Sequence, residues 1–215
     1  MHKMIKKNIK MLIVTSIIIL LPVAAGLILW EKLPEQIPVH FNAQGIADGW
    51  SGKGFGVFGM PLFLLAIHWL CTVITGLDPK KKNITQKNMG LVLWICPAIS
   101  LFVSGAVYAY ALNSKINIST AFMLFFGVLF IIVGNYMPKC KQNYSIGIKI
   151  SWTLNSEENW NYTHRLAGKI WVIGGLFIIA TSFLNWVWLF AATAIIMVML
   201  PIAGSYLFYK KESQK

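Results

Sequence analysis

Histidines and carboxylates are the side chains of this sequence that could transfer protons. His164 follows Glu157 and Glu158 closely enough for a histidine and a carboxylate to act as base and acid. No serine or cysteine nucleophile stands beside them at a fitting spacing. The sequence therefore does not favour an enzyme.

Two further histidines could bind or relay something. His40 and Asp48 could ligate a metal ion, but two ligands without a third make a weak site, so we expect no metal and no cofactor. His68 lies deep in an apolar run, where an ionisable residue is a candidate for function. A lone neutral histidine can also satisfy itself against a backbone carbonyl, and we favour this structural role for His68.

Apolar runs dominate the chain. The composition is 57% hydrophobic and only 12% charged, unlike that of a soluble domain. Each run approaches the roughly 20 residues that a helix needs to cross about 30 Å of hydrocarbon. The sequence predicts an all-α integral membrane protein with six transmembrane helices: Met11–Trp30, Phe55–Gly76, Gly90–Leu112, Ser119–Tyr136, Ala167–Leu184 and Val187–Phe208.

Basic residues are distributed unevenly between the connections. If the N-terminus is cytoplasmic, all of the 19 basic residues except Lys32, Lys53 and Lys115 lie on the cytoplasmic side, as the positive-inside bias requires. We therefore expect both termini in the cytoplasm. The net charge of +12 is explained by this orientation and by anionic headgroups of the lipid bilayer, without direct binding of nucleic acid.

The first apolar run has a second interpretation. Lys3–Lys10, the run itself and Pro22–Gly26 together resemble a secretory signal peptide with its cleavage site. The apolar character continues to Leu29 and Trp30, which favours a retained helix.

The middle of every apolar run lacks Asp, Glu and Arg. A proton-coupled transporter or a charge-lined pore normally needs such groups, so this absence counts against both. A small membrane transporter or channel without coupled chemistry stays the alternative function.

The connection after the first run, residues 31–54, is called the cap loop here. Ile37–Phe41 reads as a short extended segment, because Pro38 biases its predecessor toward extended geometry. Asn42–Gly45 and Asp48–Gly49 have the composition of turns. We expect an ordered cap in which two aromatic side chains pack onto the outer face of the bundle, Phe41 and Trp50.

The connection before the fifth run, residues 135–168, is called the signature loop. Ile146, Ile148 and Ile150 alternate with polar or small residues, which predicts a strand-like segment with one buried side. Asn155 or Ser156 then offers a helix cap, and the spacing from Asn155 to Glu158 resembles a capping box.

Three aromatic residues of the signature loop are informative about its packing: Trp152, Trp160 and His164. Trp160 and His164 are four residues apart and should share one face of a short helix. Two tryptophans, Trp152 and Trp160, are unfavourable to leave in water, so they must pack on the bundle, lie in the headgroup layer or contact a partner. The neighbouring Arg165 can reach loop carbonyls or lipid phosphates.

Both loops resemble the signatures of the SdpI family of bacterial membrane proteins. The first motif is Leu33-Pro34, Ile37 to Asn42, Gly45, Asp48 to Trp50 and Lys53. The second, longer motif is Gly134 to Lys139, Asn143, Ile146 to Lys149, Trp152 to Leu154, Glu158 to Trp160, Thr163 to Arg165 and Gly168. One departure is Lys149, where arginine is expected more often, because lysine keeps the charge but loses the bidentate fork.

The resemblance implies a multi-pass immunity protein in the cell membrane of a Gram-positive bacterium. Such a protein protects its cell from a secreted, membrane-acting toxin peptide of the SDP type. The resemblance also implies signalling, in which the toxin-engaged protein holds a cytoplasmic autorepressor at the membrane.

The motifs divide the chain into an N-terminal half, residues 1–89, and a C-terminal half, residues 90–215. Residue by residue, the resemblance implies a toxin-facing surface in the cap loop at His40, Asn42, Asp48 and Trp50. It implies a cytoplasmic signalling surface in the signature loop at Asn143, Gly147, Lys149, Trp152, Thr153, Trp160, His164 and Arg165. Assigning one side of the membrane to each role is an inference from the topology.

Overall fold

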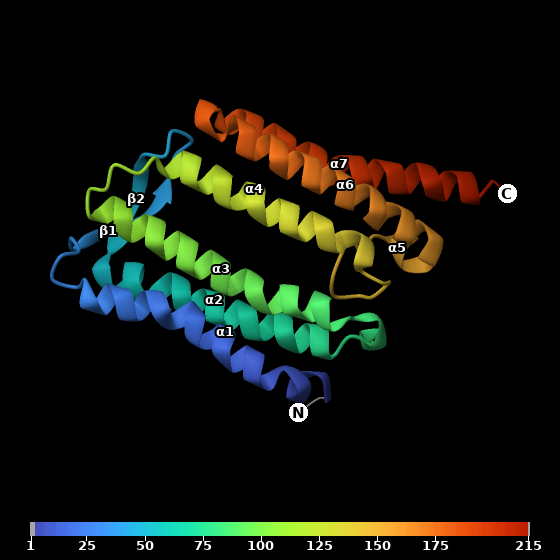
Figure 1. Cartoon of the computed structure of the whole chain (residues 1–215), viewed down its shortest axis with the longest axis horizontal. Coiled ribbons are helices and arrows are strands. Elements are labelled where there is room, and N and C mark those ends of the chain that lie inside the picture. The colour runs from blue at the N-terminus through green and yellow to red at the C-terminus, as the bar shows by residue number, and fades with distance from the viewer. Residues whose placement is uncertain (1–2, 215) are drawn as a thin grey trace. The chain divides into compact units, whose positions relative to one another are not determined.

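A computed structural model describes residues 3–214 of the chain and is mostly helical (Figure 1). Short 3-10 turns, Lys81–Asn83, Met137–Lys139 and Ser182–Leu184, join or extend the main elements. The helices and strands are α1 (Lys3–Ile28), β1 (Gln36–Phe41), β2 (Ala47–Gly52), α2 (Lys53–Gly76), α3 (Gln86–Ala111), α4 (Ile118–Tyr136), α5 (Ser151–Asn155), α6 (Glu157–Thr181) and α7 (Val187–Glu212).

Within residues 3–214, six helices are long and apolar enough to cross a membrane. Their most apolar windows are only 17% to 33% buried inside the protein, so most of their apolar side chains point outward. A soluble protein does not expose so much continuous apolar surface, whereas lipid covers it without penalty. The predicted class, an all-α integral membrane protein with six spanning helices, is confirmed. The side of the membrane on which each end lies stays a prediction.

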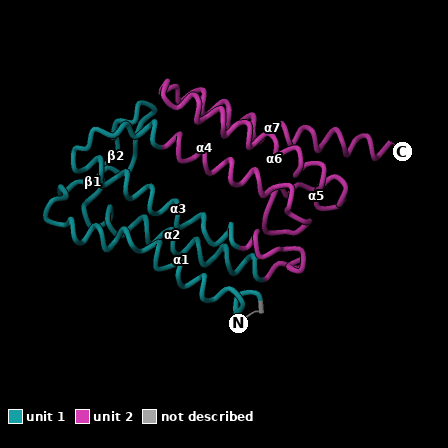
Figure 2. The backbone as a smooth tube through the Cα atoms, in the orientation of Figure 1, with its two compact units in different colours: residues 1–76, 90–121 teal, residues 77–89, 122–215 magenta. Residues whose placement is uncertain are grey.

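The chain forms two compact units, coloured separately in Figure 2. Unit 1 comprises the chain up to Gly76 together with Gly90–Ala121, and unit 2 comprises Leu77–Met89 together with the chain from Phe122 onward. The connection between α2 and α3 therefore belongs to the same unit as the signature loop. The division into halves at residue 89, which followed the two motifs, stays a prediction.

The cap loop of unit 1 folds as a two-stranded antiparallel hairpin of β1 and β2. Ile37 is fully buried and packs in one cluster with Leu33, Val57 and Tyr108. The Phe41 ring contacts Tyr110 edge to face, with 5.0 Å between the ring centres. The predicted extended segment over Ile37–Phe41 is thus β1, and burial of one of its faces holds the hairpin against the helices.

Two details expected for the cap loop are wrong. Asp48 and Gly49 lie within β2 and not in a turn. Trp50 is 51% exposed and does not pack onto the bundle. The exposure of Trp50 follows from the two-residue period of a strand, because Trp50 faces the same outward side of β2 as Asp48.

The second unit contains the antiparallel pair α6 and α7. Asn185 adopts a left-handed conformation (φ +54°) in the tight turn between them, which lies where the fifth and sixth predicted apolar runs are separated. Ser156 caps α6, its side chain accepting from the Asn159 N–H at 3.1 Å. The predicted capping box from Asn155 to Glu158 is wrong, because Asn155 is the last residue of the short helix α5.

The strand-like segment predicted over Ile146–Ile150 is also wrong. The structure has no strand over residues 143–150. Gly147 has a positive φ of +115°, which interrupts an extended backbone, and the three isoleucines are all half-buried. Hydrogen bonds from side chains, and not the backbone hydrogen bonds of a β-sheet, hold this segment in its conformation.

Candidate functional site

The signature loop is folded around the amide of Asn143, which is fully buried. Its Oδ1 accepts from the N–H groups of Ser145 and Ile146 at 2.9 and 2.7 Å. Its Nδ2 donates to the carbonyls of Lys141 and Ile146 at 2.8 and 3.1 Å. One side chain therefore satisfies four backbone groups, in the manner of an Asx turn.

Gly147 and His164 fit against each other next to this turn. The His164 ring lies 1% exposed and stacks on Trp160, with 4.0 Å between ring centres and 20° between planes. A Cβ on Gly147 would overlap His164 Nε2. Glycine is thus required here both by its φ of +115° and by the close approach of the ring.

Hydrogen bonds to both ring nitrogens of His164 define its tautomer. Nδ1 lies 2.8 Å from the Trp160 carbonyl and so donates to it, whereas Nε2 accepts from the Ile148 N–H at 3.0 Å. A doubly protonated ring could not accept this bond. His164 therefore fixes the loop in place, and it could not act as an acid or a base without breaking these contacts.

Trp160 of α6 and Thr153 of α5 connect these two helices to residues 140–150 of the signature loop. Trp160 is fully buried and its indole N–H donates to the Cys140 carbonyl at 2.7 Å. Thr153 Oγ1 donates to the Ile148 carbonyl at 2.8 Å and accepts from the Ile150 N–H at 3.1 Å. Gln142 Nε2 donates hydrogen bonds to the carbonyls of Thr153 and Leu154, both at 2.9 Å.

The Leu77–Met89 segment supplies a carboxylate that the loop surrounds. Asp78 is 2% exposed, and its Oδ2 accepts from the Tyr144 N–H at 2.9 Å and from the Ser145 hydroxyl at 2.5 Å. Its Oδ1 accepts from the Lys80 N–H at 2.7 Å. The Lys80 ammonium donates to Gln142 Oε1, and Asn83 Nδ2 donates to the Gln142 carbonyl at 2.7 Å. Two connections far apart in sequence form one hydrogen-bonded body.

Cys140 lies at the centre of this body and is 5% exposed. Burial raises the pKa of the Cys140 thiol, although the Asn143 amide, which donates to Sγ at 3.4 Å, acts in the opposite direction. A protonated, enclosed thiol reacts slowly with alkylating reagents.

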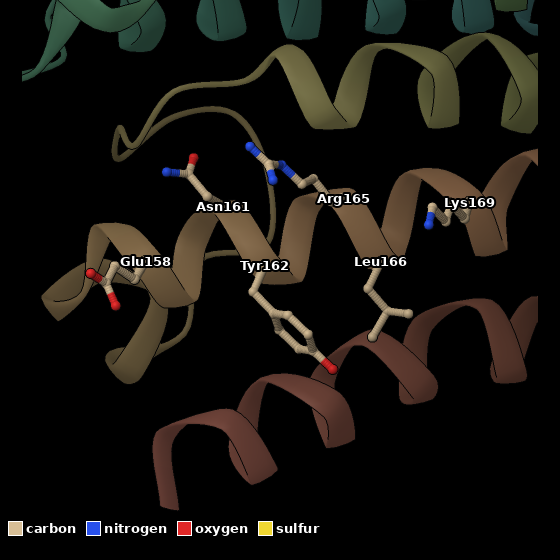
Figure 3. A pocket seen from close by; sticks show the side chains of 6 residues that line it. All are labelled: Glu158, Asn161, Tyr162, Arg165, Leu166 and Lys169. Atoms are coloured by element: carbon tan, nitrogen blue, oxygen red, sulfur yellow. The ribbon is translucent and has the colours of Figure 1, made fainter. Parts of the chain in front are cut away.

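The remaining signature residues lie at the surface. Lys149 is exposed, and its ammonium donates to the Ser145 carbonyl at 3.2 Å. Trp152 is half-buried against two tyrosines of α7, with ring centres 5.6 Å from Tyr206 and 6.0 Å from Tyr209. Arg165 is exposed on α6 (Figure 3). Asn143, Gly147, Thr153, Trp160 and His164 therefore shape the loop, while Lys149, Trp152 and Arg165 are accessible to a partner.

The cap-loop residues form a smaller polar surface in unit 1. His40 Nδ1 and Asp48 Oδ1 lie 2.5 Å apart across the hairpin, with the His40 side chain 72% exposed. Asn42 Oδ1 closes the hairpin turn by accepting from the N–H groups of Gln44 and Ile46, both at 3.0 Å. In residues 3–214 no three metal-ligating side chains come together. Exposed Trp50 completes this surface.

His68 lies fully buried in unit 1, where its Nε2 is 2.9 Å from the Thr15 hydroxyl of α1. The expected backbone-carbonyl partner is thus wrong, because a hydroxyl from the neighbouring helix takes its place. Its Nδ1 has no hydrogen-bond partner within the described residues. The ring links α1 to α2.

Sequence reasoning missed several polar residues that hold the signature loop in place. Asp78 could have been noticed as the one acid in a connection rich in lysine. Asn159 had no comparable signal, yet it is fully buried and its amide bonds both the carbonyl and the hydroxyl of Ser205 in α7, at 3.0 and 2.5 Å. No local pattern reveals a partner that lies tens of residues away.

Comparisons with known proteins cover both motifs. The model of the SdpI/YfhL protein family matches residues 139–205, which include most of the signature loop. A domain of unknown function, DUF1648, matches residues 17–65, which include the cap loop. The "Immunity protein SdpI" of Bacillus subtilis (strain 168) is 30% identical over 96% of this chain and 97% of its own length. No solved structure matches the chain.

Proposed function

Because the chain belongs to the SdpI family, we propose that it is an immunity protein that protects a Gram-positive bacterium, from within its cell membrane, against a secreted toxin peptide. The observation that carries this proposal is the similarity to an immunity protein along nearly the entire chain. The structure adds a physical reason, since a binder of an apolar peptide needs ordered surfaces at the membrane and no catalytic group.

We assign the toxin-facing role to the cap loop. Its exposed side chains combine a hydrogen-bonded histidine–carboxylate pair, His40 and Asp48, with the apolar ring of Trp50. Exposed tryptophan is a frequent centre of binding energy in protein interfaces. The hairpin beneath it is held rigidly by buried Ile37 and by Lys53, whose ammonium lies 2.9 Å from Glu35 and donates to the Trp30 carbonyl at 3.1 Å.

We assign the signalling role to the signature loop, on the cytoplasmic side. Its accessible residues Lys149 and Trp152 would contact an acidic or amphipathic surface of a cytoplasmic autorepressor. The buried residues beneath them keep this surface in one conformation. A partner recruited here would thus recognise a preformed surface, which lowers the entropic cost of binding.

Replacing Trp50 with alanine is expected to raise sensitivity to toxin without changing the amount of folded protein. A toxin-sensitive host expressing the chain is challenged with the SDP-type toxin peptide and with a panel of other secreted membrane-active peptides, and survival is counted. The unmodified chain should protect. Losing a central interface tryptophan costs about 2 kcal/mol or more, so about 30-fold less toxin should kill the Trp50→Ala strain.

The matched control is Trp188→Ala, which removes another highly exposed tryptophan, 81% exposed at the start of α7. It should leave protection unchanged. Equal loss of protection in both variants would contradict the role of the cap loop. No protection by the unmodified chain against any peptide would contradict the proposed function itself.

A further inference from the structure

A basic pocket lies on the exposed side of α6, within unit 2 (Figure 3). Its volume is about 490 Å³. Arg165 and Lys169, one helical turn apart, supply two positive charges. Within residues 3–214, neither side chain has an ion-pair or hydrogen-bond partner. The residues around it are Glu158, Asn161, Tyr162, Arg165, Leu166 and Lys169.

The floor of the pocket is apolar and fixed by α7. Tyr162 and Leu166 point toward α7 in Figure 3, whereas Asn161 and Arg165 point away from it. The Tyr162 ring stacks on Phe208 with 4.8 Å between centres. Leu166 lies against Gly204, where any larger side chain would collide with it. Packing of α6 against α7 therefore forms this pocket. Its two unpaired cations lie beside a floor made by one aromatic and one aliphatic side chain.

Along this one face of α6, the side chains change from polar to basic and then to apolar. Residues spaced by three or four share a face, so the face that carries Arg165 and Lys169 continues through Ile173 and Leu176. Ile173 is 66% exposed and Leu176 is 55% exposed. Toward the start of the helix the same face carries Asn161 and Glu158. The sequence of groups is thus polar acceptor, double cation and exposed apolar stripe.

We propose that this face binds one anionic glycerophospholipid whose headgroup is a glycerol phosphodiester. The phosphate contacts Arg165 and Lys169, and the acyl chains lie along Ile173 and Leu176. Hydroxyls of the headgroup glycerol donate to the side-chain oxygens of Asn161 and Glu158.

Charge complementarity selects this occupant over other lipids. Two unpaired cations favour an anionic headgroup, and a planar guanidinium donates hydrogen bonds to two phosphate oxygens at once. Glu158 lies about 10 Å along the axis from Arg165, by the helical rise, and it would repel a second phosphate. A zwitterionic headgroup would bring an ammonium group close to the two basic side chains. A single phosphodiester with a neutral polyol satisfies all of these groups.

The test titrates the purified full-length chain in detergent with phosphatidylglycerol or with phosphatidylcholine of identical acyl chains. Native mass spectrometry counts the bound lipid. Each basic residue beside an anionic group contributes about a factor of five, so one phosphatidylglycerol should bind about 25-fold more tightly than phosphatidylcholine. Arg165→Gln with Lys169→Gln should remove this preference, and Arg165→Gln alone should weaken it about fivefold.

The matched control, Lys6→Gln with Lys7→Gln, removes two exposed charges from α1 and should keep the preference. Glycerophosphoglycerol, which lacks acyl chains, should not displace the lipid at equal concentration. Displacement by it would identify a site for soluble phosphodiesters and overturn the proposal. Equal affinity for both lipids, or equal effects of both double variants, would overturn it as well.

Discussion

Replacing Gly147 with alanine is expected to open the signature loop. The alanine Cβ would overlap the His164 ring, and a φ of +115° is unfavourable for any residue with a side chain. Such backbone strain costs about 1–3 kcal/mol, before the bond from the Ile148 N–H to His164 is lost. This strain exists only in the closed loop. The substitution therefore lowers the free energy of opening the loop by this amount.

Cys140 reports this opening directly, because its thiol is enclosed by the closed loop. With Cys71 and Cys96 replaced by alanine, alkylation of the Gly147→Ala variant in detergent should be about 5- to 150-fold faster than that of the parent, which corresponds to a loss of about 1–3 kcal/mol. The matched control is Gly90→Ala in α3, because a Cβ at Gly90 meets open space and an alanine favours the helix. Equal rates in the two variants would show that Gly147 is not required by the loop.

Replacing Asn143 with alanine is expected to have a comparable or larger effect on stability. The change leaves two N–H groups and two carbonyls inside the loop without the partner that now satisfies them. An unsatisfied buried group costs about 1–3 kcal/mol, so the total loss should be about 3 kcal/mol or more. Hydrogen exchange of residues 144–150 should accelerate strongly, and thermal unfolding in detergent should begin at a lower temperature.

Asn42→Ala in the cap loop provides the comparison for Asn143. Asn42 makes the same kind of turn, accepting from Gln44 and Ile46, but it is only half-buried. Water can replace the amide there, so this loss should be below about 1 kcal/mol. Similar losses for the two asparagines would contradict the view that the signature loop is held together by its buried amide.

The six spanning helices could be predicted because each depends on a local property. A run of about 20 apolar residues needs no distant partner to identify it. The turn at Asn185 was predictable for the same reason, since it separates two such runs. The early start of α6 at Glu157 was less visible, because its first turns are polar and are fixed by the Ser156 cap and by buried Asn159.

The interior of the signature loop could not be derived from local pattern. Alternating isoleucines indicated a strand, but a strand needs a neighbour, and the backbone instead bonds to Asn143, Thr153 and His164. The bond from Tyr144 to Asp78 joins residues 66 positions apart. Resemblance to a family identified Asn143 and Gly147 as important, and only the structure supplies the reason, namely four satisfied backbone groups and a positive φ.

Burial also changes the roles that the sequence assigned to the signature residues. Trp160 and His164 are internal, so alanine at either position is expected to disturb the whole loop and not a single contact. Variants of Lys149 test recognition by a partner more cleanly, because this side chain is exposed. The native Cys140 is likewise a poor probe of membrane sidedness, since the folded loop encloses its thiol.

Cysteine accessibility in intact cells tests the central claim, that the cap loop and the signature loop lie on opposite sides of the membrane. Lys149→Cys and Gln44→Cys each place a thiol at an exposed position, and the chain without an added cysteine gives the background. A membrane-impermeant maleimide should label Gln44→Cys in intact cells and Lys149→Cys only after the membrane is permeabilised. Labelling of Lys149→Cys in intact cells would contradict the orientation and the division of roles that follows from it.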